Sequence, residues 1–357
     1  MLNKNIWKDK KILITGHTGF KGSWLTIWLK MLGAEVIGYA LEPYTERDNF
    51  VLSKLEDKIT YIIGDVRDYQ KLYDVLRKYE PEFVFHLAAQ PIVRESYINP
   101  KETFDVNIGG TVNLLECCRL TESVKVIVNI TTDKCYENKE WIWGYRENDR
   151  LGGYDPYSSS KAGSEIVTVA YRQSFFNPEK VNIHSKNIAS ARAGNVIGGG
   201  DWQTDRLIPD CIDSLEKNEP IIIRNPSAVR PWQHVLEPLS GYLLLSEKMF
   251  ENPGQYCEAW NFGPAEGSMK SVGEVTDLVI QNWGDGFWQD QSEKNAPHET
   301  NILKLDISKA RTRLGWNPVL SIEQAVATTV DWYKSYMEKD IYRFCEKQIE
   351  LYMRNIV

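Results

Sequence analysis

Short apolar runs alternate with helix-like patterns through the first half of the chain, and this alternation limits the fold more than any other feature. The apolar runs cover residues 11–15, 36–39, 59–63, 83–87 and 124–130. Between them, helix-like patterns cover residues 24–32, 69–79 and 103–119. Strands that alternate with helices of this length form a parallel sheet with right-handed crossovers. The sequence therefore predicts an α/β fold with a Rossmann-like, doubly wound parallel sheet.

The character of the chain changes after about residue 190, where glycine and proline become frequent. This change favours a smaller, loop-rich substrate domain in the C-terminal part of the chain. Within that part, residues 283–300 are expected to be irregular and residues 321–352 to be helical.

Composition excludes several classes of protein. The 357 residues are 42% hydrophobic and 25% charged, which is typical of a globular chain. The net charge of -7 argues against binding to nucleic acid or to an anionic membrane surface. There is no run of ~20 apolar residues and no secretory h-region, and six scattered cysteines fit a reducing compartment. We therefore expect a cytoplasmic protein, and the five dispersed histidines predict no metal site.

A glycine-rich segment lies between the first strand and its helix, with glycines at positions 16, 19 and 22. Glycine allows a tight turn and lets an anion approach the backbone N–H groups, and the N-terminus of the helix adds a partial positive charge. The spacing is GxxGxxG rather than GxGxxG. Its place before an amphipathic helix predicts a site for a dinucleotide pyrophosphate, and the alternative is an ordinary strand–helix turn.

The end of the second strand bears on the choice of dinucleotide. The acid that holds the ribose hydroxyls in many such folds is absent at Ala40 or displaced to Glu42. Arg47 is too far along the chain to stand beside a 2′-phosphate, which favours NAD over NADP. Asp65 follows the third strand, where it either accepts from the adenine amino group or is a simple turn residue.

Two Tyr-x-x-x-Lys pairs occur, and their surroundings separate them. Tyr97 and Lys101 enclose Pro100, which spoils a shared helical face. Tyr157 and Lys161 begin a helical pattern and share one face. A lysine ammonium favours the phenolate and lowers the tyrosine pKa from ~10 toward the working pH. Such a phenolate beside a nicotinamide can accept a hydroxyl proton while the ring accepts a hydride; the alternative is a surface pair.

Polar residues also follow the fifth strand. Thr132, Asp133 and Lys134 come at its carboxyl end, the edge at which open α/β sheets bind ligands. The adjacent acid and amine are candidates for proton transfer. The alternative is ordinary loop chemistry after a strand.

These features stand in an order and at distances that resemble the extended short-chain dehydrogenase/reductase family, over nearly the whole chain. Within that family, four longer strings resemble the nucleotide-sugar 4,6-dehydratases that act on CDP-D-glucose. The strings are residues 16–24, 132–136, 192–202 and 230–235.

The resemblance implies a hydro-lyase that uses NAD and takes CDP-D-glucose as substrate. The sugar is oxidised at C4, water is eliminated across C5 and C6, and the hydride returns to C6. The product would be CDP-4-dehydro-6-deoxy-D-glucose, an intermediate for the deoxysugars of O-antigen and lipopolysaccharide. NAD ends the cycle unchanged, so the enzyme should retain it between turnovers.

Five catalytic roles carry over by this resemblance. Tyr157 is the first base, Lys161 positions the ribose and tunes Tyr157, and Thr132 hydrogen-bonds the C4 oxygen. Asp133 is the acid that assists loss of the C6 hydroxyl. Lys134 stands where related dTDP-glucose dehydratases carry a glutamate that removes the C5 proton. It would act as a neutral amine, which requires a large fall in pKa from ~10.4, or would stabilise an enolate.

The resemblance also implies the residues that bind the two ligands. The substrate pyrophosphate needs cationic donors, and Arg192, Arg206 and Arg230 are candidates. Asn195 matches a substrate-binding position, and His298 is a candidate for a loop that closes over the substrate. The expected cofactor-binding residues are Gly16, Thr18, Gly19, Phe20, Lys21, Gly22, Asp65, Val66, Leu87, Ala88, Ala89, Asn107, Tyr157 and Lys161.

We expect residues 1–190 with 229–262 to form the NAD-binding domain, and residues 191–228 with 263–357 to form the nucleotide-sugar-binding domain. The family usually pairs subunits through two helices, here about 103–119 and 157–173, which implies a homodimer or homotetramer. Two other functions stay open: a nucleotide-sugar 4-epimerase on the same scaffold, and a catalytically inactive NAD(P)-sensing protein.

Overall fold

The computed structural model describes residues 2–292 and 303–356, and within them a seven-stranded sheet forms the centre. The strands lie in the order β11-β6-β5-β4-β1-β2-β3, and every neighbouring pair is parallel. The chain moves outward from β1 in one direction through β2 and β3 and in the other through β4, so the switch point lies between β1 and β4. The predicted Rossmann-like fold is confirmed. The strands are β1 (Lys11–Thr15), β2 (Glu35–Ala40), β3 (Thr60–Ile63), β4 (Phe83–His86), β5 (Val126–Thr131), β6 (Asn187–Arg192) and β11 (Ala259–Asn261).

Alternate residues of the central strands pack into opposite layers, because successive strand side chains point to opposite faces. Ile12 and Ile14 belong to one hydrophobic core, whereas Leu13 belongs to the other. The first core is covered by α2 (Phe20–Met31), α11 (Leu236–Glu251) and α14 (Ile341–Asn355), and the second by α4 (Tyr69–Tyr79), α7 (Gly110–Leu120) and α8 (Pro156–Ser174). The sheet is therefore buried on both faces, as its continuous apolar strands predict.

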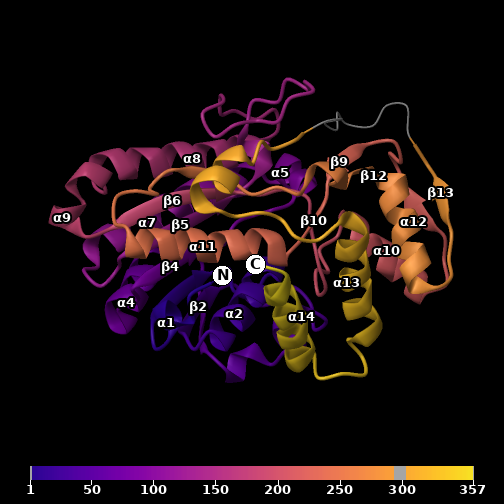
Figure 1. Cartoon of the computed structure of the whole chain (residues 1–357), viewed down its shortest axis with the longest axis horizontal. Coiled ribbons are helices and arrows are strands. Elements are labelled where there is room, and N and C mark those ends of the chain that lie inside the picture. Colours follow the sequence, from indigo (N-terminus) through magenta and orange to yellow (C-terminus); the bar gives the residue numbers. More distant parts are fainter. Residues whose placement is uncertain (1, 293–302, 357) are drawn as a thin grey trace.

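The C-terminal part adds a second group of elements at one end of the molecule (Figure 1). Strand β8 pairs with β13 in parallel, and β9 pairs with β12 in antiparallel fashion. Strand β11 lies at the edge of the large sheet, so the chain returns there before the last helices. The division into two domains stays a prediction. The elements of this part are α10 (Leu207–Glu216), β8 (Ile221–Ile223), β9 (Val229–Pro231), β12 (Met269–Ser271), α12 (Val272–Trp283), β13 (Trp288–Asp290) and α13 (Ile322–Ser335).

Several sequence expectations need correction. The expected helix over 103–119 is α6 (Pro100–Phe104), a π-helical turn over 105–109, and then α7. The region after residue 190 also contains helix α11, which the sequence does not predict because the helix is buried nearly all round and shows no amphipathic stripe. Residues 321–352 form two helices, and the segment expected to be irregular contains β13. The shorter elements are α1 (Lys4–Trp7), α3 (Asn49–Leu52), α5 (Val93–Ile98), α9 (Val181–His184), β7 (Val196–Ile197) and β10 (Gln233–His234).

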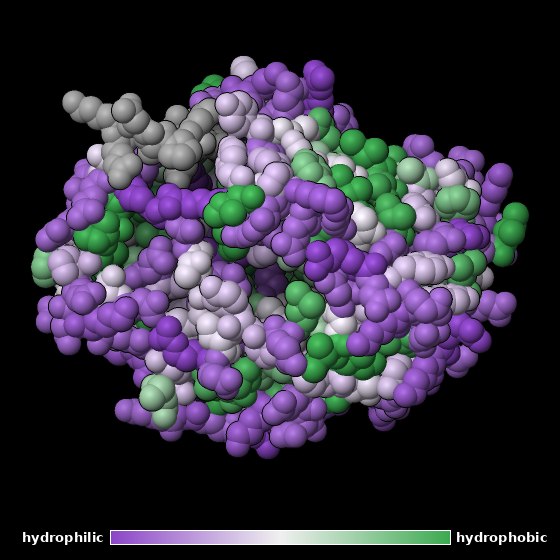
Figure 2. All heavy atoms as spheres, turned by 180° about the vertical axis from the view of Figure 1, so that it is seen from behind, coloured by the Kyte–Doolittle hydropathy of each residue, from purple (hydrophilic) through white to green (hydrophobic). Residues whose placement is uncertain are grey.

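Apolar residues mostly lie inside the molecule. Figure 2 shows one face on which hydrophilic residues predominate and hydrophobic ones form separate small groups. In the described part of the chain, no helix has both the length and the apolar character needed to span a bilayer. The polar residues that matter most for function instead gather where the carboxyl ends of β1, β4, β5 and β6 meet.

Candidate active site

The glycine-rich segment forms the turn from β1 to α2, and two of its glycines make backbone contacts that no other residue allows. Gly16 has a φ of +77°, and a Cβ there would lie 2.6 Å from the backbone nitrogen of Ala88. A Cβ on Gly22 would lie 2.1 Å from the carbonyl oxygen of Gly16. The first N–H groups of α2 have no acceptor within the helix. This bare backbone cradle at a helix N-terminus fits a pyrophosphate group.

Other cofactor candidates lie on this turn and after β3. The Thr18 hydroxyl donates to the carbonyl of Leu41 at 3.0 Å, which ties the turn to the end of β2. Asp65 pairs with Arg67, whose hydrogen bonds lower the pKa of the Asp65 carboxyl. That carboxylate stays 26% exposed, so its charged form can still accept from a ligand. Val66 packs so closely that a side chain on Gly110 would contact it.

Asn107 lies in the helical break at 105–109, and its amide group is used by the protein itself. Its Oδ1 accepts the N–H of Gln90 at 2.9 Å, and its Nδ2 donates to the Ser160 hydroxyl at 2.8 Å. Asn107 therefore joins the loop after β4 to α8, one residue before Lys161. The structure thus shows Asn107 as a support for this loop.

Tyr157 and Lys161 share one face of α8, as the sequence predicts, and both side chains are buried. The N-cap residue Asp155 accepts the N–H of Ser158 at 2.9 Å and fixes the start of the helix. The Lys161 ammonium donates to the carbonyl of Ile130 at 3.5 Å. Burial lowers the pKa of Lys161 to about 8 against the opposing effect of a glutamate one turn further on.

The expected fall in the pKa of Tyr157 is not found in the chain alone. Burial raises the pKa of the phenol to about 12, while a hydrogen bond with Thr132 and the charge of Arg206 act in the opposite direction. Desolvation of the phenolate thus outweighs the nearby cations. Positive charge from a bound ligand would favour the phenolate of Tyr157.

Asp133 lies at the end of β5 and is held on both carboxyl oxygens. The Thr132 hydroxyl donates to Oδ1 at 2.9 Å, and the Asn195 amide donates to Oδ2 at 3.2 Å. The side chain is 2% exposed. The structure therefore brings Thr132, Asp133 and Tyr157 together, where a base and an acid can act on one small substrate.

Two lysines differ from expectation. Lys134 as a neutral base requires a desolvated amine, but its side chain is exposed, so water surrounds it in the chain alone. Lys21, which the sequence assigned to the cofactor loop alone, has a pKa lowered to about 8 by burial and by Arg206 and Lys161. A lysine in the first turn of a helix opposes the helix dipole, and this unfavourable position is the sequence feature that could have singled out Lys21.

Arg192 does not lie where a substrate pyrophosphate could reach it, which corrects the prediction. Its guanidinium is 2% exposed and pairs with the fully buried Glu165 at 2.8 Å. It also donates to the Tyr136 hydroxyl at 2.7 Å and to the carbonyl of Glu147 at 3.1 Å. Arg192 therefore stabilises the end of β6 inside the protein.

The remaining substrate candidates lie nearer the surface. Arg206 precedes α10, pairs with Asp201 at 2.5 Å and is 32% exposed. Arg230 lies on β9 and donates to the carbonyl of Val229 at 3.0 Å. Both guanidinium groups come from the C-terminal part of the chain, as the sequence predicts. His298 lies outside the described residues.

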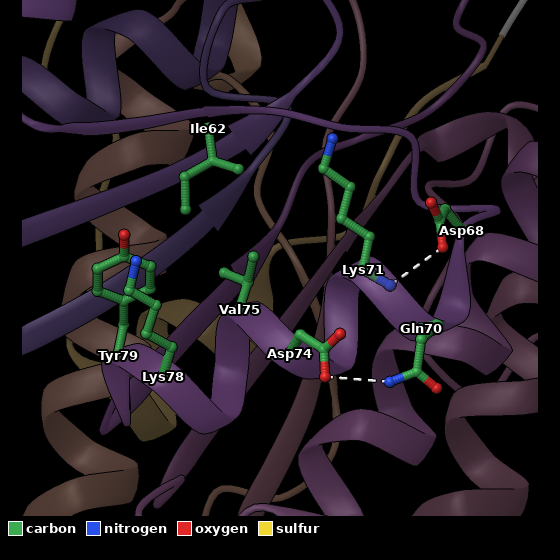
Figure 3. Close-up of a pocket in the computed structure, with 8 residues that line it drawn as sticks. All are labelled: Ile62, Asp68, Gln70, Lys71, Asp74, Val75, Lys78 and Tyr79. Carbon is green, nitrogen blue, oxygen red and sulfur yellow. Dashed lines mark hydrogen bonds between the residues drawn. The ribbon is translucent and has the colours of Figure 1, made fainter.

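A hollow of about 470 Å³ lies elsewhere, beside the edge strand β3 (Figure 3). Its polar lining belongs to α4 and the N-cap residue of that helix. Asp68 and Asp74 accept hydrogen bonds from groups of the same helix. It contains none of the predicted site residues, and we assign it no function. The lining residues are Ile62, Asp68, Gln70, Lys71, Asp74, Val75, Lys78 and Tyr79.

Comparison with known proteins places this site in context. Residues 13–329 match the model of the family described as GDP-mannose 4,6 dehydratase. The chain is 48% identical over 348 residues to the CDP-glucose 4,6-dehydratase of Salmonella typhimurium strain LT2, covering 98% of this chain and 97% of that protein.

Two solved structures share the fold. The dTDP-glucose 4,6-dehydratase of Streptomyces venezuelae, solved with NAD bound, has a TM-score of 0.76 at 24% identity and covers 91% of this chain and 97% of its own. The UDP-glucuronic acid 4-epimerase of Bacillus cereus, solved with UDP-glucuronic acid and NAD, also has a TM-score of 0.76, at 22% identity, over 91% of this chain and 99% of its own.

Replacing Arg192 with methionine should lower the free energy of unfolding by about 3–5 kcal/mol, because Glu165 would keep a buried charge without its cation. Urea denaturation measures this loss. Arg150→Met is the matched control, because its ion pair with Glu137 is largely exposed and predicts a loss of about 1 kcal/mol or less. Unchanged stability of Arg192→Met together with a raised KM would instead restore Arg192 to substrate binding.

Replacing Lys161 with methionine should stabilise the folded chain at neutral pH. The folded state holds an ammonium whose pKa is about 8, whereas the unfolded chain, with a pKa of ~10.4, binds the same proton more tightly. The variant should gain about 2–3 kcal/mol below pH 8. The gain should shrink between pH 8 and 10, where the wild-type fold loses the proton first. Urea titrations across this range that show a constant difference would contradict the argument.

Proposed function

The chain belongs to the family described as GDP-mannose 4,6-dehydratase, and we propose that within this family it dehydrates CDP-D-glucose to CDP-4-dehydro-6-deoxy-D-glucose. The observation that carries the proposal is the 48% identity, over nearly the full length of both chains, to a CDP-glucose 4,6-dehydratase. The grouping of Thr132, Asp133 and Tyr157 around one space supports the same reaction. The chain would serve deoxysugar synthesis for lipopolysaccharide.

NAD is the proposed cofactor, and the chain offers a site that fits it. The glycine cradle at α2 would hold the pyrophosphate, the backbone of Leu87 and Ala88 packs against Gly16, and Asp65 would accept from the adenine amino group. Bound NAD supplies an acceptor for the C4 hydride, a donor for C6 and a positive charge near the phenol. At the end of β2, Ala40 is buried and Glu42 accepts from the Tyr61 hydroxyl at 2.9 Å, so neither favours a 2′-phosphate.

The residues of the chain divide the proton transfers between them. Tyr157, with Lys161 one turn away, removes the proton of the C4 hydroxyl, and Thr132 hydrogen-bonds the C4 oxygen. Asp133 then donates a proton to the C6 hydroxyl as water leaves. Lys134 follows Asp133 directly and is our candidate for the C5 proton, on condition that the substrate excludes water from its exposed amine. Arg206 and Arg230 would bind the substrate pyrophosphate.

CDP-D-glucose deuterated at C4 gives the decisive test. The proposal predicts a product with the label at C6 and, after alkali, the absorbance of a 4-keto-6-deoxy sugar. A 4-epimerase would leave the sugar oxygenated at C6 and produce no such absorbance. An NAD-sensing protein would leave the substrate intact. Tyr157→Phe should keep bound NAD but lose turnover. Comparison with the dTDP, UDP and GDP analogues then measures the nucleotide preference.

Pairing of subunits through α7 and α8 is part of the proposal, as a homodimer or as half of a homotetramer. Apolar side chains are exposed along these helices and just beyond their ends: Phe104, Leu120, Ile166 and Phe175. The six cysteines are free and buried, which suits the reducing cytoplasm that we propose. Sedimentation at micromolar concentration should show a dimer or tetramer, and Ile166→Lys should weaken it. A monomer throughout would contradict the pairing.

A further inference from the structure

The carboxyl group of Asp133 occupies the space that a side chain on Gly194 would fill. A Cβ built on Gly194 would lie 2.0 Å from Cγ and Oδ2 of Asp133 and 2.1 Å from Oδ1. Side-chain atoms do not approach so closely, so the carboxyl group and any larger residue at position 194 exclude each other. Gly194 follows β6, whereas Asp133 follows β5, so the contact crosses two neighbouring strand ends.

The segment that carries Gly194 is fixed from its far side. The buried Gln233 side chain donates to the carbonyl of Gly194 at 3.0 Å and to that of Phe262 at 3.0 Å. The backbone N–H of Gln233 donates to the carbonyl of Asn195 at 3.1 Å. Strands β7 and β10, which pair in parallel, continue this attachment. The backbone beside Asp133 therefore cannot move away easily, and displacement would fall on the carboxyl group.

Asn195 completes the arrangement from the same segment. Its φ of +50° is in the left-handed region, which asparagine tolerates better than most residues. In this conformation its amide donates to Oδ2 of Asp133, while Thr132 donates to Oδ1 from the other side. Each carboxyl oxygen thus has its own donor, and the face of the group rests against a residue without a side chain.

We propose that Gly194 and Asn195 are positioning residues for Asp133, which hold its carboxyl group where it protonates the departing C6 hydroxyl. The inference rests on the proposed dehydration and deepens it. In the elimination, the C5 proton passes to the proposed base, Lys134, and the electron pair of the broken C5–H bond forms the C5–C6 double bond. The C6–O bond breaks toward oxygen, which takes the proton of Asp133 and leaves as water. Oxidation at C4 uses Tyr157 instead, so loss of Asp133 positioning stops the reaction between the two stages.

Gly194→Ala tests the proposal in single-turnover experiments with the full-length enzyme, NAD and CDP-D-glucose. We expect C4 oxidation at close to the wild-type rate, followed by accumulation of the 4-keto sugar and of reduced nicotinamide. Water loss should slow by about 10²–10⁴-fold, the usual contribution of a general acid. Mass spectrometry of quenched samples separates the 4-keto sugar from the dehydrated product. Gly267→Ala, at a glycine with open space around it, is the matched control and should behave as wild type.

The double variant with Asp133→Asn separates positioning from general damage. If Gly194 acts through Asp133, Gly194→Ala should slow water loss no further once Asp133 has lost its acid. Asn195→Gly removes one donor and still tolerates the left-handed backbone, so it should slow water loss in the wild-type background and likewise have no effect beside Asp133→Asn. This second variant keeps the test informative if Gly194→Ala folds poorly.

Three results would overturn the proposal: wild-type water loss by Gly194→Ala, equal slowing of C4 oxidation and water loss, or additive effects with Asp133→Asn. Failure of the proposed function gives a different result, because the wild-type enzyme itself would then form no dehydrated sugar from CDP-D-glucose. The variants therefore test the positioning of Asp133 once the wild-type enzyme has been shown to convert CDP-D-glucose.

Discussion

The buried ion pair between Glu165 and Arg192 joins the parts from which the site is made. Glu165 lies one turn after Lys161 on α8, and Arg192 ends β6 just before Gly194. The same carboxylate accepts from Thr131, which ends β5, at 2.5 Å. Two charges without water are costly unless every donor and acceptor is satisfied, so this pair fixes the helix and both strand ends in one arrangement. The positions of Tyr157 and Asp133 depend on that arrangement.

Burial sets the acidity of the groups around this pair. It lowers the pKa of Lys161 and of Lys21 to about 8 and raises that of Tyr157 to about 12. In the chain alone, lysine therefore gives up its proton before tyrosine does. A phenolate beside an ammonium forms readily when a ligand brings positive charge, which ties activation of the base to occupation of the site.

The sequence predicts what depends on local patterns. The strands, the glycine turn and the shared face of Tyr157 and Lys161 follow from spacing along the chain, and the structure has them within a few residues. Arg192 was assigned wrongly because a lone arginine after a strand looks the same whether it points to ligand or to a buried acid. The contact between Gly194 and Asp133 joins residues distant in sequence, so no local pattern could have revealed it. Nor does sequence show whether Lys134 is exposed.

The groups proposed for the two chemical stages share the buried ion pair but differ in their nearer contacts. Tyr157 and Lys161 lie on α8, which Glu165 ties to Arg192. Asp133 lies in the turn after β5 and contacts Gly194 and Asn195. The 4-epimerase of Bacillus cereus shares the fold, and an epimerase needs the first stage but no water loss. The dehydration that we propose for this chain needs in addition an acid at the end of β5 and a neighbouring strand end that leaves room for it. In this chain glycine provides that room, because any side chain at position 194 would occupy the space of the acid.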